Sequence, residues 1–256
     1  MHHRVLCLHG YTQNAKKFRD RTGPFRRNMK RRMDMVYITA PMEATGFQSS
    51  GAVEAAAEFG DGPSAAWWNR SEDPKRTWEE IKQSAETVVQ AMKEHGPIDG
   101  IIGFSQGAGM AAIMMALQHA SQQQQQQQHC DTVYDSDVQT LIESVRPLGG
   151  ALKFAFFFAG FFPDVPQFEA LVSGAAGKIG VPSLHMVGRA DTIVPMARGR
   201  ELAARAFTAE AAVVMEHEGG HFVPCNAAWR AKYQEFLDSI GSAEYQEFLG
   251  SIGSAE

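Results

Sequence analysis

The chain has 256 residues, 44% of them hydrophobic and 21% charged, a composition typical of soluble globular proteins. Its 24 basic and 29 acidic residues give a net charge of −5, which does not favour a nucleic-acid or membrane-surface role. The longest apolar stretch, 154–162, is too short to span a bilayer. Three widely spaced cysteines predict a reducing compartment with neither disulfides nor a metal site, so we expect a cytoplasmic protein, with a nuclear location left open.

Short apolar runs alternate with helical patterns along the chain. The runs are apolar on both faces, as parallel strands covered by helices are. They cover residues 5–8, 35–39, 100–104, 154–158, 183–187 and 212–215, and helices are expected over 75–94, 106–119, 195–207 and 226–240. This alternation predicts one α/β domain over 1–240, with a doubly wound, mostly parallel sheet.

Three segments depart from this alternation. Residues 42–74 form a long irregular stretch with four large aromatic residues, which is a candidate lid or insertion. Residues 121–136 contain seven consecutive glutamines and are predicted to form a flexible loop. The last twelve residues nearly repeat the twelve before them. Since two copies of one helix end cannot occupy the same docking site, we interpret 241–256 as a duplicated tail outside the domain.

The stretch Gly103-Phe104-Ser105-Gln106-Gly107 matches the pattern G-x-S-x-G of hydrolase nucleophiles. Chance matches to five letters are common, but this serine follows an expected strand and precedes an expected helix. That is the context of a nucleophile elbow, a strained turn that lifts the hydroxyl clear of the backbone. A serine also needs a base, an acid that orients the base, and donors for the oxyanion.

An acid and a base follow the serine in the order that this chemistry requires. Asp191 comes after a later strand, at the edge where open α/β sheets bind ligands, although it could instead cap the next helix. Asp164 competes with it but follows the preceding strand. His221 stands beyond two glycines after the last expected strand, whereas His217 lies at the end of that strand and is expected to be structural.

Two backbone N–H groups are expected to form the oxyanion hole. One belongs to Gln106, directly after the nucleophile, and the other to Tyr11, in the loop after the first strand. The dipeptide His9-Gly10 breaks that strand before Tyr11. Alone, this dipeptide would indicate only a tight turn.

Five motifs together resemble the fungal family of serine hydrolases, which includes ovarian-tumour-candidate-like esterases. In chain order they are LCLHGYTQNAKKFRDRTGPFRR, WW, GFSQGA, GRADTIVP and EGGHFVP, and the resemblance spans Arg4 to Leu237. It implies an α/β-hydrolase fold and carboxylic-ester hydrolysis by a triad of Ser105, Asp191 and His221, the same set that the order of residues predicts. The chain departs from the family pattern at the glutamine run and the tail, neither of which touches a motif.

The predicted reaction is hydrolysis of a short- to medium-chain acyl ester through an acyl-enzyme, with no metal or organic cofactor. The alternative is a thioesterase that releases acyl groups from a carrier protein or coenzyme A. Nine basic residues within 16–32 would then dock an acidic acyl-carrier protein, although a solvated helix face is the simpler interpretation. A non-catalytic ligand-binding protein is a third hypothesis. Trp67, Trp68 and Phe162 are candidate walls of the acyl pocket, with core packing as the alternative.

Overall fold

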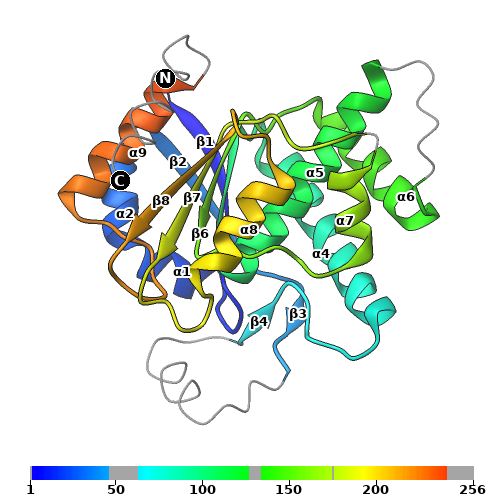
Figure 1. Ribbon diagram of the computed structural model, residues 1–256, viewed down its shortest axis with the longest axis horizontal. Coiled ribbons are helices and arrows are strands. Elements are labelled where there is room, and N and C mark those ends of the chain that lie inside the picture. Colours follow the sequence, from blue (N-terminus) through cyan, green and yellow to red (C-terminus); the bar gives the residue numbers. More distant parts are fainter. Residues whose placement is uncertain (1, 46–62, 127–133, 175, 241–256) are drawn as a thin grey trace.

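The computed structural model describes residues 2–45, 63–126, 134–174 and 176–240. Its centre is a parallel sheet in the order β2-β1-β5-β6-β7-β8, with helices on both faces (Figure 1). The strands are β1 (His3–Leu8), β2 (Met33–Ile38), β5 (Gly100–Phe104), β6 (Phe154–Phe158), β7 (Ser183–Gly188) and β8 (Ala212–His217). The predicted α/β class and the parallel sheet are confirmed.

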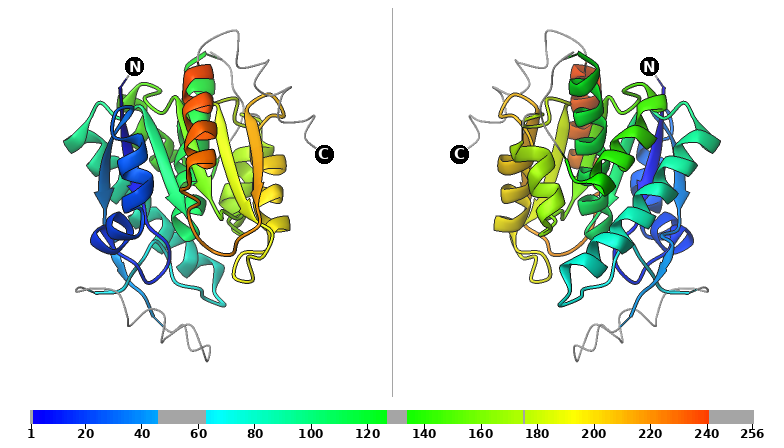
Figure 2. Two further views of the ribbon diagram at one scale, coloured as in Figure 1. Left: turned by 90° about the vertical axis from the view of Figure 1, so that its left-hand side faces the viewer. Right: turned by 90° about the vertical axis from the view of Figure 1, so that its right-hand side faces the viewer.

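The helices form two layers, one on each face of the sheet (Figure 2). One layer contains α1 (Ala15–Arg21), α2 (Gly23–Met29) and α9 (Ala227–Ser239), and the other contains α4 (Pro74–His95), α5 (Gln106–Gln126), α6 (Ser136–Val145), α7 (Pro166–Ser173) and α8 (Met196–Ala206). Strand β6 shows why its sequence is apolar throughout. Phe156 and Phe158 pack into the first layer, while Ala155 and Phe157 pack into the second.

Helix α5 corrects the loop expected over 121–136. The helix continues through Gln126, and α6 already begins at Ser136, so only 127–133 of that interval lie outside the described residues. Glutamine is a good helix former, and packing adds to this preference. Within the run, the Gln124 side chain donates to Oε1 of Gln139 in α6 at 3.0 Å.

The irregular segment 42–74 contains a small second sheet. Strand β3 (Met42–Glu43) pairs antiparallel with β4 (Ala65–Ala66), and the Ala65 N–H donates to the Gln13 carbonyl in the turn after β1. Residues 46–62, the greater part of the predicted lid, lie outside the described residues, so the lid stays a prediction. The duplicated tail 241–256 also lies outside them. No helix in the described ranges is long and apolar enough to cross a membrane.

Candidate active site

Ser105 occupies a strained turn between β5 and α5. Its φ angle is +53°, in the left-handed region that residues with a Cβ rarely adopt. The turn is held by hydrogen bonds, since the Ser105 N–H donates to the Phe158 carbonyl at 2.9 Å and its own carbonyl accepts from the Ala108 N–H at 2.9 Å. The structure therefore places Ser105 in the kind of turn that the sequence motif predicts.

The two glycines of the motif are required by close backbone approach. A Cβ on Gly103 would overlap the backbone of Ala108, and a Cβ on Gly107 would overlap the carbonyls of Leu8 and His9. Helix α5 therefore begins in direct contact with the end of β1. This contact brings the turn after β1 next to the serine.

The structure brings Asp191 and His221 into direct contact. Asp191 is buried, and its Oδ1 accepts hydrogen bonds from the backbone N–H groups of Ile193 and Val194 at 2.9 and 2.8 Å. Its Oδ2 lies 2.7 Å from Nδ1 of His221. With the carboxylate ionised, Nδ1 carries the proton in this bond, and Nε2 is left as the basic nitrogen. The competing acid, Asp164, is exposed.

The loops that carry the acid and the base are joined by backbone hydrogen bonds. The Arg189 N–H donates to the His217 carbonyl at 2.8 Å, and the Ala190 N–H donates to the Gly219 carbonyl at 3.2 Å. The His221 ring packs against Phe104, with ring centroids 4.8 Å apart, so it lies beside the turn that holds the serine. The Ser105 hydroxyl and His221 do not form a hydrogen bond in this structure. Catalytic hydrogen bonds are often long before substrate binds.

The turn after β1 lies next to Ser105. A Cβ on Gly10 would stand 3.4 Å from the Ser105 Cβ, which places the segment from His9 to Tyr11 beside the nucleophile. Gln106 is the first residue of α5, and the first N–H groups of a helix have no partner within it. The two predicted oxyanion donors thus come from adjacent segments.

The Gln106 side chain connects the nucleophile turn to the Trp67-Trp68 segment. Its Oε1 accepts from the Trp67 N–H at 2.9 Å, and its Nε2 donates to the Trp68 carbonyl at 2.6 Å. The Trp67 indole in turn donates to the His9 carbonyl at 2.8 Å. These three contacts link both sides of the expected oxyanion hole. Only a backbone role was expected for Gln106, because nothing in a single sequence signals these side-chain bonds.

His9 is fully buried, and both of its ring nitrogens have partners. Nδ1 lies 2.8 Å from the Gly10 carbonyl, and Nε2 accepts from the Ala40 N–H at 3.0 Å. Burial lowers the pKa of His9 to about 4, so the ring is neutral at physiological pH. A neutral ring suits this arrangement, because one nitrogen must donate while the other accepts. His9 fixes the turn between β1 and Tyr11.

Two of the three predicted pocket walls lie in the core instead. Trp67 has no exposed surface and uses its indole N–H within the protein. Phe162 is also buried; it packs against Phe168 at 4.8 Å between ring centroids and beneath the guanidinium of Arg205. The alternative of core packing therefore holds for both. Trp68 is half-buried and stays a candidate for contact with substrate.

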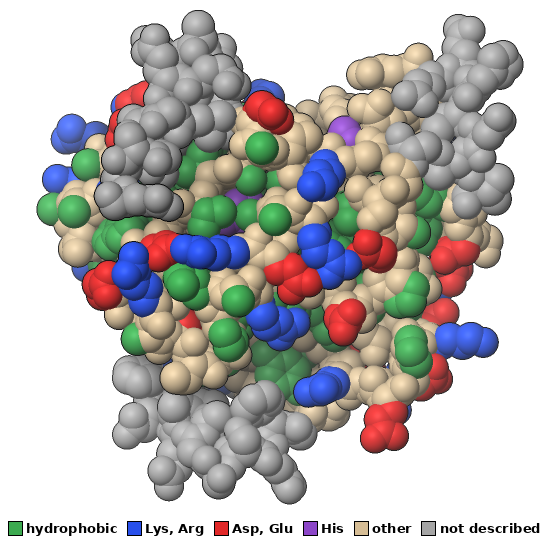
Figure 3. Space-filling view, in the orientation of Figure 1, with side chains coloured by type: hydrophobic (Ala, Val, Ile, Leu, Met, Phe, Trp, Pro, Cys, Tyr) green, Lys and Arg blue, Asp and Glu red, His purple; other side chains and the backbone are tan. Residues whose placement is uncertain are grey.

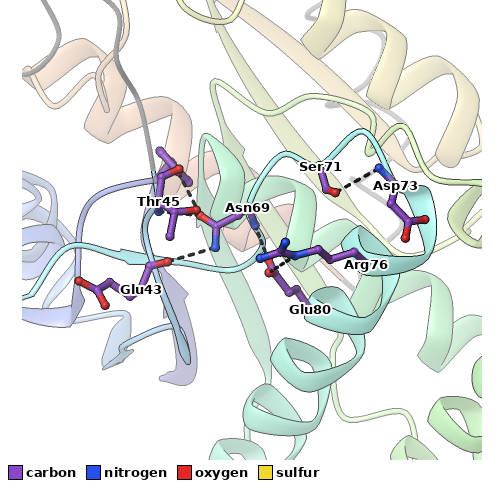
Figure 4. Close-up of polar contacts among 8 residues, drawn as sticks. Glu43, Thr45, Asn69, Ser71, Asp73, Arg76 and Glu80 are labelled. Atoms are coloured by element: carbon purple, nitrogen blue, oxygen red, sulfur yellow. Dashed lines mark hydrogen bonds and ion pairs between the residues drawn. The ribbon is translucent and has the colours of Figure 1, made fainter.

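Asn69 forms hydrogen bonds that connect the described parts of the 42–74 segment (Figure 4). Its Oδ1 accepts from the Thr45 N–H at 2.9 Å and from the Tyr11 hydroxyl at 3.1 Å, and its Nδ2 donates to the Glu43 carbonyl at 3.1 Å. Its own N–H donates to the Glu80 carboxylate at 2.6 Å. Through its side chain and its backbone N–H, Asn69 thus connects this segment to α4 and to the residue expected to supply the second oxyanion donor.

Comparison with known proteins identifies the family of this chain. The family model described as "Serine hydrolase (FSH1)" matches residues 1–233. The chain belongs to the FSH1 serine hydrolase family. Among curated relatives of this FSH1 serine hydrolase, esterase OVCA2 of Danio rerio is 32% identical over 91% of the chain and 96% of the relative. Esterase OVCA2 of Xenopus tropicalis is 31% identical over 93% of each.

The fold of this FSH1 serine hydrolase is also found among solved structures. The crystal structure of Zea mays acyl-protein thioesterase 2 superimposes with a TM-score of 0.54 and 18% identity, covering 92% of this chain and 94% of that one. At this level of identity the likeness concerns the fold. The predicted α/β-hydrolase architecture is confirmed, and the chain is an enzyme of the serine hydrolase class. Within the described ranges, no three His, Cys, Asp or Glu side chains gather as a metal site would require.

Proposed function

We propose that this FSH1 serine hydrolase cleaves carboxylic esters of short- to medium-chain acyl groups through a covalent acyl-enzyme. Ser105 is the nucleophile, His221 the general base and Asp191 the acid that orients it. The proposal rests above all on one observation. The strained serine turn and the hydrogen-bonded Asp191–His221 pair lie at the same edge of the sheet, where His221 packs against the neighbour of the serine.

In the first half of the reaction, Nε2 of His221 takes the Ser105 proton as the serine oxygen attacks the ester carbonyl. The tetrahedral oxyanion accepts hydrogen bonds from the backbone N–H groups of Gln106 and Tyr11. Asp191 stabilises the imidazolium that forms. The C–O bond to the alcohol then breaks, His221 returns the proton to the departing oxygen, and the acyl group remains on Ser105.

In the second half, water replaces the alcohol. His221 removes a proton from the water as its oxygen attacks the acyl carbonyl, and the same N–H groups bind the second oxyanion. Collapse of this intermediate breaks the bond to Ser105, whose oxygen regains a proton from His221. The products are one carboxylic acid and one alcohol, with the enzyme restored.

A fluorophosphonate probe tests the nucleophile. We expect labelling of the wild-type protein and none of Ser105→Ala, which keeps the fold because alanine fits where serine stands. Labelling that survives this substitution would show that another residue is the nucleophile. A panel of p-nitrophenyl esters from acetate to decanoate then tests the acyl preference, and we expect kcat/KM to be highest among the shorter chains.

Thioester hydrolysis is the second candidate, because the same steps act on a thioester carbonyl and part of the 16–32 basic region faces solvent. Lys17, Arg27 and Arg31 are partly or fully exposed on or beside α1 and α2 and are available to an acidic acyl-carrier protein. Added salt should then slow hydrolysis of a carrier-bound acyl group and leave a free acyl-thioester unaffected. Equal salt effects on both substrates would exclude carrier docking.

A further inference from the structure

A concave site lies at the edge of the sheet opposite to Ser105. It is a cavity of about 650 Å³, a volume within the range of small-molecule sites. Arg4, Met33 and Asp99 line it, and these residues stand at the beginnings of β1, β2 and β5. Ser105 follows the far end of β5, a strand of five residues or roughly 16 Å, so the cavity is separate from the candidate active site.

The acidic side chains of this cavity already have cationic partners. Asp34 pairs with Arg4 at 3.1 Å. Asp99 pairs with Lys153 at 2.8 Å and also accepts from the Arg4 N–H at 3.0 Å. Asp34 and Asp99 therefore do not pair with the other basic residues that line the cavity.

Three basic side chains of the lining have no ion pair among the described residues: Arg19, Arg26 and Lys30. Nε of Arg26 is buried and has no hydrogen-bond partner among the described residues, so no neighbouring acceptor neutralises this guanidinium. Arg26 and Lys30 are four residues apart along one helical path, a spacing at which like charges repel. These cations converge on the cavity without internal compensation.

Several basic residues elsewhere on the molecule are paired with acidic side chains. On the face shown in Figure 3, basic and acidic side chains are interspersed. Arg200 and Arg205 of α8, for example, pair with Glu216 and Glu169. Within 16–32 itself, Arg32 pairs with Asp238. Arg27 and Arg31 lie outside the cavity and also have no ion pair among the described residues. The cavity differs from them in bringing three such cations to one concave surface.

We propose that this cavity binds a soluble small molecule that carries two or more phosphate groups. Arg19, Arg26 and Lys30 supply the cationic contacts, and guanidinium groups suit the paired oxygens of phosphate. Met35 and Pro97 offer apolar surface to a ring attached to the phosphates. A small molecule fits a concave site of this volume, whereas a carrier protein would need the outward-facing Arg27 and Arg31. The proposal stands independently of the ester chemistry at Ser105.

Calorimetric titration of the full chain with pyrophosphate, ADP and adenosine tests this proposal at physiological ionic strength. Pyrophosphate and ADP should bind with one-to-one saturation, and adenosine should bind at least about tenfold more weakly because it lacks the anion. The same binding is expected after Ser105 has been labelled with a fluorophosphonate. Absence of saturable binding, or its loss on labelling, would overturn the proposal.

Paired substitutions locate the ligand. Arg26→Gln combined with Lys30→Gln should weaken ADP binding at least about tenfold. Arg27→Gln combined with Arg31→Gln removes the same charge from neighbouring outward positions and should change the affinity less than about twofold. Equal weakening by both pairs, or a greater effect of the second pair, would show binding to the outer basic surface and reject the cavity. The first pair should also leave the melting temperature of the free protein unchanged or higher, whereas a structural role would lower it.

Discussion

His221 Nδ1 lies 2.7 Å from Oδ2 of Asp191, although the two residues are 30 positions apart in the chain. Oδ1 of Asp191 accepts hydrogen bonds from two backbone N–H groups, which fix the plane of the carboxylate independently of His221. Because the two carboxylate oxygens have different partners, a substitution at position 191 can keep the backbone contacts and change the contact with His221.

Asp191→Asn should abolish most of the activity and preserve the fold. The amide oxygen can still accept from the Ile193 and Val194 N–H groups, which turns the amide nitrogen toward His221. His221 then accepts at Nδ1 and carries its proton on Nε2, the tautomer that cannot accept a proton from serine. We expect kcat/KM to fall by about 10⁴ with p-nitrophenyl butyrate, and a circular dichroism melt checks the fold. Asp164→Asn is the matched control. If Asp164→Asn loses activity and Asp191→Asn does not, Asp164 is the acid that orients His221.

Trp67→Phe should lower both stability and kcat. The ring is largely retained, but the carbonyl of His9 loses its indole donor in a buried site, which costs about 1–3 kcal/mol. Because His9 begins the turn that carries the Tyr11 N–H, we expect kcat to fall on the order of tenfold or more with a smaller change in KM. Steady-state kinetics and urea unfolding measure the two effects.

Trp78 provides the control for that substitution. It is equally a buried tryptophan, yet its indole nitrogen has no hydrogen-bond partner within the described residues. Trp78→Phe should therefore change packing and leave kcat nearly unaffected. If both variants lose kcat to the same extent, general loosening of the core explains the result and the positioning role of Trp67 is wrong.

Gly107→Ala should strongly destabilise the protein. The added Cβ would overlap the Leu8 and His9 carbonyls, and backbone atoms cannot move aside as a flexible side chain can. We expect a loss of about 3 kcal/mol or more in the free energy of unfolding, measured with urea. Gly180→Ala, where nothing lies within 4 Å of the new atom, should be nearly neutral. Similar stability of the two variants would contradict the close approach of α5 to β1.

Stability should fall as the pH is lowered from 6.5, partly because of His185. Burial lowers its pKa to about 3, whereas an exposed histidine titrates near 6.5. Between these values the unfolded chain binds the proton more tightly, so the stabilising contribution is complete above pH 6.5 and is lost as the pH falls toward 3. The total contribution is at most about 5 kcal/mol.

The contribution of His185 can be isolated by substitution. The ring stacks on Phe157 at 4.6 Å between centroids, and Nδ1 has no hydrogen-bond partner among the described residues. His185→Phe keeps a flat ring that does not titrate. Urea midpoints between pH 8 and pH 5 should therefore decline less steeply for this variant than for the wild type. Parallel declines would assign the acid sensitivity to other groups, His9 among them.

Local patterns in the sequence predicted the strands and several helices. The six apolar runs gave every strand of the main sheet, because strands covered on both faces have a composition that short windows reveal. Helices α6 and α7 were not predicted, and 16–32 was expected to present only a helix face, without its division into α1 and α2. These helices have only 7 to 10 residues, and short helices show few repeats of the helical pattern. The extent of α5 was underestimated because repeated glutamine was taken to indicate a loop, and the contact of Gln124 with α6 has no signal in the sequence.

The sequence alone determined the family, the fold class and the order of Ser105, Asp191 and His221, because these depend on residue type and on position relative to the strands. The tertiary structure decided which partners meet. Asp191, and not Asp164, contacts His221. Trp67 and Phe162, expected in the acyl pocket, are buried in the core. The Gln106 side chain forms a hydrogen bond with the Trp67 N–H. The reason is physical: strand order and burial place distant segments in contact, and these contacts have no local signature in a single chain.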